Sequence, residues 1–151
     1  MNRNMQKKYT SLGLMSGTSG DGVDASIIET DGINRLDVIV DKYFEYDSSI
    51  FKEIHNLKEK IFNINDLERL NDDLKKLERE ITFFHAKIIK EFEKKKSDFL
   101  VGFHGQTMFH NPSLKISKQL GDGRLLNQLT KKNIIFNFRK NDILHGGEGA
   151  P

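Results

Sequence analysis

The sequence contains no cysteine and no tryptophan, and only two of its 151 residues are proline. Without thiols, disulfide bonds and thiolate metal sites are excluded. No apolar run approaches the roughly 18 residues that a membrane-spanning helix requires. Residues 1–8 are polar and lack the apolar core of a secretory signal peptide. These absences favour a soluble, cytoplasmic protein that is not embedded in a membrane.

A strong charge of one sign is also missing, since 24 basic and 22 acidic residues leave a net charge of +2. That balance is not typical of nucleic-acid-binding proteins. The one dense basic run, Lys94 to Lys96, follows a predicted helix, where cations complement the negative end of the helix dipole. We therefore expect no nucleic-acid partner.

Three strands with tight turns are predicted in the first third of the chain. Tyr9–Met15 and Val23–Thr30 flank a glycine-rich turn, and Leu36–Tyr46 follows the turn signal Asp31-Gly32. Strands joined by such short connections predict an antiparallel meander.

The middle of the chain reads as helical. A short helix is expected from Ser48 or Ser49 to Leu57, and a long one from a capping box at Asn65 and Glu68 to about Glu93–Lys96. Its apolar stripe has steps of three and four residues: Leu67, Leu70, Leu74, Leu77, Ile81, Phe84 and Ile88. This stripe favours a helix packed on a sheet, with a coiled coil as the alternative.

The last third predicts a strand, helix and strand in succession. Phe99–Phe103 is a buried strand leading into a loop, Gly123–Lys132 a helix, and Ile134–Phe138 a second buried strand. Arg139 and the residues after it are expected in a terminal glycine-rich loop. A βαβ unit that follows a meander indicates an α/β domain with a mixed sheet and flanking helices.

The segment from Gly17 to Asp24 carries the strongest chemical pattern. Its glycines let the backbone approach a ligand, successive N–H groups can form an anion nest, and Thr18 and Ser19 add hydroxyl donors. Asp21 and Asp24 suit loop orientation or a Mg²⁺ ion. The Lys and Ser/Thr of a Walker A loop are missing, and a following strand excludes a Rossmann fingerprint. A purely structural hairpin turn is the alternative.

A second group of polar residues follows the buried strand Phe99–Phe103. His104, Gln106 and Thr107 offer donors and acceptors for sugar hydroxyls, and Arg139 at a later strand end can grip a carboxylate. A local turn with a satisfied histidine remains the alternative for the first segment, and a structural pairing with Asp142 remains the alternative for Arg139. His55 and His85 fall on helix surfaces or edges and are given no role.

Four segments together resemble the motifs of the anhydro-N-acetylmuramic acid kinase family. They are Gly13–Asp24, Val101–Thr107, Gln119–Asp122 and Phe138–Pro151, in matching order and spacing over nearly the whole chain. The family belongs to the actin, hexokinase and Hsp70 superfamily, so the resemblance implies a ribonuclease-H-like ATPase lobe. We expect residues 1–151 to be the N-terminal lobe of a two-lobe sugar kinase, truncated at its C-terminus and inactive alone.

The resemblance also implies an activity: ATP and water open the 1,6-anhydro ring and phosphorylate O6, giving N-acetylmuramic acid 6-phosphate in peptidoglycan recycling. It assigns ATP binding to the first motif, and we expect Mg²⁺ at Asp21, a general base beyond Pro151, and a homodimer as an option for the full-length protein. The expected nucleotide-binding residues are Gly17, Thr18, Ser19, Gly20, Asp21, Gly22, Val23 and Asp24, and the expected sugar contacts are His104, Gln106, Thr107 and Arg139. A non-catalytic ATP-binding module and a helical interaction protein remain alternatives.

Overall fold

The computed structural model describes residues 7–94 and 98–149. Residues 1–6, 95–97 and 150–151, among them Lys95 and Lys96 of the basic run, lie outside the described residues. Within this part of the chain, no helix combines the length and apolarity needed to cross a membrane.

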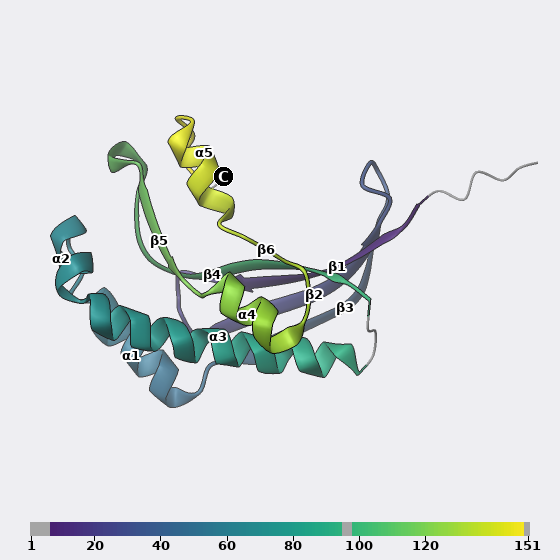
Figure 1. The fold of residues 1–151 in the computed structure, drawn as a ribbon, viewed down its shortest axis with the longest axis horizontal. Helices are drawn as coiled ribbons and strands as arrows, with labels where there is room; N and C mark the ends of the chain where they lie inside the picture. Colours follow the sequence, from purple (N-terminus) through teal and green to yellow (C-terminus); the bar gives the residue numbers. More distant parts are fainter. Residues whose placement is uncertain (1–6, 95–97, 150–151) are drawn as a thin grey trace, which may run out of the picture.

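A six-stranded mixed sheet forms the centre of the fold (Figure 1). β1 (Tyr9–Ser16), β2 (Gly22–Thr30) and β3 (Leu36–Glu45) make the predicted antiparallel meander. β4 (Leu100–Asn111) pairs with β1 in parallel and brings the second half of the chain into the sheet. β5 (Ile116–Leu120) and β6 (Ile134–Phe136) share the other edge of β4, antiparallel and parallel respectively.

The helices are divided between the two faces of the sheet. α1 (Ser48–Lys58), α3 (Asn71–Glu93) and α4 (Gly123–Thr130) lie on one face, whereas α5 (Phe138–Leu144) lies on the other (Figure 1). The remaining helical segments are α2 (Ile64–Arg69) and a single 3₁₀ turn at Pro112–Leu114. The α/β class with a mixed sheet, flanking helices and one long helix is confirmed.

Strand alternation decides which side chains enter the core. In β1 and β2, every second residue is buried under the helices: Leu12, Leu14, Val23, Ala25 and Ile27. Leu70, which precedes α3, and the α3 stripe residues Leu74, Leu77, Ile81 and Ile88 pack into the same cluster. The stripe is therefore core, which confirms the helix packed on a sheet and leaves it unavailable for a coiled coil.

Three local expectations were wrong. The helix predicted from Asn65 is two helices: Asn63 and Asp66 form the capping box of α2, and the chain breaks at Leu70 before α3 begins. The predicted loop His104–Thr107 is the middle of β4, which continues into a hairpin with β5. The segment beginning at Phe138 is helix α5, so Arg139 lies in a helix and not in a loop.

The continuation of β4 depends on one glycine. Between Leu14 and Ser16 of β1, β4 advances from Phe103 to Gln106, one residue more than its partner. The extra residue makes a β-bulge, and Gly105 within it has φ +73°. A Cβ at Gly105 would lie 2.4 Å from the Leu120 carbonyl oxygen, so both conformation and space require glycine.

Candidate functional site

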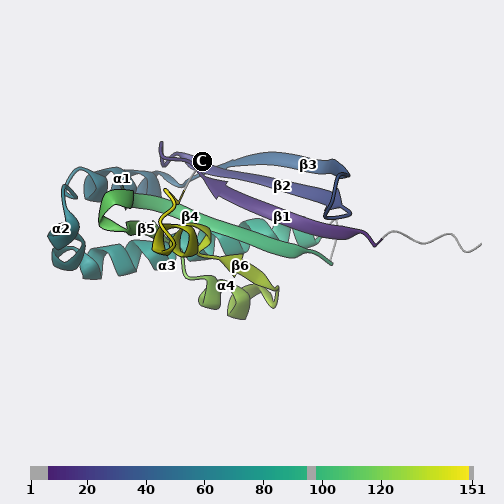
Figure 2. The same ribbon diagram turned by 90° about the horizontal axis from the view of Figure 1, so that it is seen from above.

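The glycine-rich turn connects β1 and β2 at the carboxyl end of β1, where β4 continues past its partner strand (Figure 2). The turn runs from Gly17 to Asp21 and is closed by a hydrogen bond from Gly20 N to Gly17 O of 3.2 Å. Thr18 and Ser19 are exposed, and within the described residues their backbone N–H groups have no hydrogen-bond partner. Free N–H groups in a glycine-rich turn are the donors that an anion nest requires.

Asp21 completes the exposed side of the turn. Ser19 Oγ donates to Asp21 Oδ1 at 2.5 Å, and this bond lowers the pKa of the carboxyl group below its ordinary value. Burial and the nearby charge of Asp21 raise the pKa of the Tyr43 hydroxyl. Asp21 is therefore a carboxylate at neutral pH and restrains the turn through Ser19.

A buried polar network fixes the base of the turn to β4. Gln106 is completely buried; its Oε1 accepts from Ser16 Oγ at 2.6 Å and its Nε2 donates to Gly17 O at 2.9 Å. The Tyr46 hydroxyl lies 2.9 Å from Ser16 Oγ, and burial raises its pKa. Because the Ser16 proton goes to Gln106, Tyr46 donates to Ser16. The network positions Gly17 without exposing any of its side chains to a ligand.

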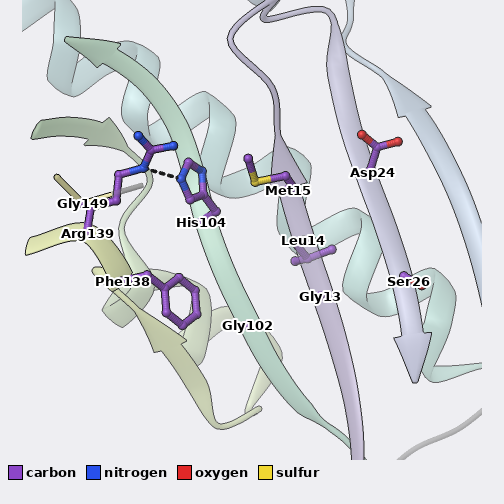
Figure 3. Close-up of a pocket in the computed structure, with 10 residues that line it drawn as sticks. All are labelled: Gly13, Leu14, Met15, Asp24, Ser26, Gly102, His104, Phe138, Arg139 and Gly149. Carbon is purple, nitrogen blue, oxygen red and sulfur yellow. Dashed lines mark hydrogen bonds between the residues drawn. The ribbon is translucent and has the colours of Figure 1, made fainter. Parts of the chain in front are cut away.

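A pocket of about 530 Å³ opens beside the turn, on the face of the sheet opposite α1 and α3 (Figure 3). Its floor is made by outward-facing positions of β1, β2 and β4, where Gly13 and Gly102 leave room, and α5 forms a wall. Met15 and Asp24 lie on either side of the glycine-rich turn, face each other across the β1–β2 ladder and both line the pocket. The turn therefore lies at the rim of this pocket, although none of residues 17–21 belongs to the pocket lining.

His104 and Arg139 meet inside the pocket, although 35 residues separate them (Figure 3). Arg139 Nε donates to His104 Nε2 at 2.9 Å, and His104 Nδ1 lies 2.8 Å from the Gly105 carbonyl oxygen. A carbonyl only accepts, so Nδ1 carries the proton and the imidazole is neutral. Burial lowers the His104 pKa, and the Arg139 charge lowers it further. With both nitrogens engaged, His104 orients Arg139 and is not available as a general base.

Arg139 keeps its terminal nitrogens for a ligand. No acidic partner of its guanidinium is found in residues 7–94 and 98–149. Asp142, the partner considered from the sequence, instead accepts from Gly149 N at 2.7 Å and holds that glycine at the pocket wall. A half-buried guanidinium of this kind can bind a carboxylate with two parallel hydrogen bonds.

The remaining residues that the sequence suggested as ligand contacts are mostly buried or have structural roles. Val23 is fully buried under the helices, and Gly20 and Gly22 are buried as well. Thr107 is 7% exposed and its Oγ1 accepts from Gln119 Nε2 at 3.4 Å, away from the residues that line the pocket. Asp122, the last residue of the third motif, caps α4 by accepting from Arg124 N and Leu125 N. Exposed donors and carboxylates are therefore found at Thr18, Ser19, Asp21 and Asp24, and the half-buried Arg139 adds a cationic donor.

The donor set limits how a metal ion would be held. No cluster of three or more His, Cys, Asp or Glu residues occurs in the described ranges. An exposed, ionised Asp21 nevertheless suits Mg²⁺, which is commonly held by one or two carboxylates together with substrate phosphates and water. Asp24 is exposed at the same pocket rim.

Two residues that contact the turn or line the pocket were not predicted from the sequence. Lys58, at the last residue of α1, donates from Nζ to the Thr18 carbonyl oxygen of the turn. Phe138, interpreted as a strand residue, supplies an apolar wall of the pocket from α5. A lysine at the end of a helix is common for dipole reasons alone, so the sequence offered no pattern that separates Lys58 from its neighbours.

Comparison with known proteins gives one consistent result. A profile described as anhydro-N-acetylmuramic acid kinase matches residues 9–151. A protein named anhydro-N-acetylmuramic acid kinase from Pelagibacter ubique is 59% identical over 149 residues, covering 97% of this chain and 40% of that protein. Proteins of the same name from Agrobacterium fabrum and Rhizobium etli are 36% and 34% identical, over 97% and 94% of this chain and 41% and 40% of their own lengths. The chain thus spans about 40% of the length of these curated relatives.

Proposed function

The chain belongs to the anhydro-N-acetylmuramic acid kinase family, and we propose that the whole protein is an ATP-dependent kinase of 1,6-anhydro-N-acetylmuramic acid. In this reaction, ATP and water convert the anhydro sugar to N-acetylmuramic acid 6-phosphate and ADP. Residues 1–151 form the N-terminal lobe, and the rest of the protein supplies a second lobe and the general base. The product would enter peptidoglycan recycling in the cytoplasm.

The observation that carries the proposal is the position of the glycine-rich turn at the rim of the pocket that holds His104 and Arg139. Phosphoryl transfer depends mainly on positioning and charge stabilisation, so the two substrates must meet at one place. The N–H groups of Thr18 and Ser19 would receive the phosphates of ATP. Asp21 would hold Mg²⁺, which neutralises phosphate charge when bound.

The sugar would lie in the pocket beside Arg139. Muramic acid carries a lactyl carboxylate, and the terminal nitrogens of Arg139 suit it because Nε is already occupied by His104. Gly13 and Gly102 in the floor leave space for a pyranose ring close to the sheet. Gln106 serves the site from below, since it is buried and holds Gly17 in place.

The proposal is tested by incubating the full-length protein with Mg-ATP and 1,6-anhydro-N-acetylmuramic acid and analysing products by mass spectrometry. We expect equimolar ADP and N-acetylmuramic acid 6-phosphate. Nucleotide binding without phosphorylated sugar would favour a non-catalytic ATP-binding module instead. The alternative of a helical interaction protein loses its basis, because the apolar stripe it requires is buried in the core.

A further inference from the structure

The underside of the glycine-rich turn rests on the last two turns of α1. Ile54 is fully buried there, and a Cβ placed on Gly20 would lie 2.8 Å from its Cγ2 atom. Lys58, four residues later and therefore on the same side of the helix, donates from Nζ to the Thr18 carbonyl oxygen. Gln106 holds the adjacent Gly17 carbonyl from β4. Two consecutive carbonyls of the turn are thus bound from the protein side.

This arrangement determines which way the turn presents its donors. A peptide group points its carbonyl and its N–H in opposite directions. With the Thr18 carbonyl bound to Lys58, the N–H of Ser19, which belongs to the same peptide group, faces away from α1. That N–H is without a partner in the described part of the chain, and Ser19 is an exposed residue.

Within the described residues, no ion pair compensates the charge of Lys58. The ion pairs found between described residues do not include it, and Asp21, the carboxylate of the turn, is engaged by Ser19. Lys58 is partly buried, and burial lowers its pKa. A lysine held only by the helix dipole would point to the carbonyls of its own helix end, whereas Nζ of Lys58 reaches a separate turn 40 residues away in sequence.

We propose that Lys58 is a positioning residue for nucleotide binding: it holds the Thr18 carbonyl and so directs the Ser19 N–H towards the phosphates of ATP. Its positive charge also favours a polyanion at the turn. The inference rests on the proposed function for the identity of the ligand. It assigns to α1 a part in the nucleotide site that the glycine-rich motif itself does not contain.

The test compares three variants of the full-length protein. Lys58→Met keeps the aliphatic stem and removes the ammonium group, Lys58→Arg keeps a cationic donor, and Lys52→Met removes an exposed lysine from the same helix. We expect Lys58→Met to raise the KM for ATP about tenfold, the effect of losing one charge-assisted hydrogen bond. The KM for the sugar should stay within about twofold, Lys58→Arg should recover most of the loss, and Lys52→Met should match the wild type.

Calorimetric titration with Mg-ATP separates this inference from the kinase proposal, because it needs no turnover. If wild type binds ATP but phosphorylates no anhydro sugar, the kinase proposal fails while the affinities still test Lys58. Equal ATP affinity for Lys58→Met and wild type would overturn the role of Lys58. The same loss in Lys52→Met, or a fall in melting temperature with unchanged ATP affinity, would also overturn it.

Discussion

His85 makes the stability of this fold depend on pH. It lies on α3 with no exposed surface, contrary to the surface or edge position expected from the sequence. Nδ1 lies 2.8 Å from the Ile81 carbonyl oxygen and therefore carries the proton, while Nε2 is buried without a partner in the described structure. The ring packs edge-on against Phe103, with centroids 4.8 Å apart. Nothing at Nε2 would stabilise a second proton.

Burial lowers the pKa of His85 from 6.5 to about 4. The unfolded chain therefore takes up this proton first as the pH falls, so the stability present above pH 6.5 is lost towards pH 4. Each pH unit between the two pKa values is worth about 1.4 kcal/mol, which gives a loss of about 2 kcal/mol between pH 8 and pH 5.

Urea unfolding at pH 8 and pH 5, followed by circular dichroism, measures this contribution. We expect His85→Phe and His85→Leu to lose about 2 kcal/mol less than wild type between the two pH values, whatever their stability at pH 8. Two replacements are used because the larger phenyl ring can overpack the site. His110→Gln, which changes an exposed histidine of β4, should retain the wild-type difference. Identical pH dependence in wild type and both His85 variants would refute the reasoning.

Two further predictions concern the support of the turn. Gly105→Ala should destabilise the protein by about 2 kcal/mol or more in a denaturation assay, because alanine is strained at φ +73° and its Cβ would meet the Leu120 carbonyl. Gly32 has a similar φ of +78° but lies in open space, so Gly32→Ala in the same assay measures the cost of the backbone conformation without the clash. Gln106→Leu removes this partner from the buried Ser16 hydroxyl and from the partly buried Gly17 carbonyl. It should lower the free energy of unfolding by about 1–3 kcal/mol and raise the KM for ATP. A Gln106→Leu protein with wild-type stability would contradict the network.

The elements with a clear period were predictable, and the departures have physical causes. Strands β1 and β2 alternate between core and surface, and the stripe of α3 repeats every three or four residues, so both were predicted from pattern alone. The stripe also hid the break at Leu70, because Leu67, Leu70 and Leu74 keep the same spacing across it.

The polar part of β4 was mistaken for a loop because its sequence has no strand period. The bulge at Gly105 shifts the alternation, so His104 faces the pocket while Gln106 is buried with Ser16. Residue types alone suggested that His104, Gln106 and Thr107 act together on a ligand. Only the backbone geometry shows that His104 lines the pocket whereas Gln106 is buried inside the protein. Likewise, only tertiary packing brings Lys58 to the turn.

The central claim is that the turn serves the nucleotide and the pocket serves the sugar. Steady-state kinetics of the full-length protein, with both substrates varied, tests it through Asp21→Asn and Arg139→Ala, using Asp41→Asn on the exposed edge of β3 as control. We predict that Asp21→Asn impairs kcat or the KM for Mg-ATP, and that Arg139→Ala raises the KM for the sugar by about tenfold or more while leaving that for ATP nearly unchanged. Unchanged constants in Asp21→Asn, or an Arg139→Ala defect confined to ATP, would contradict the account.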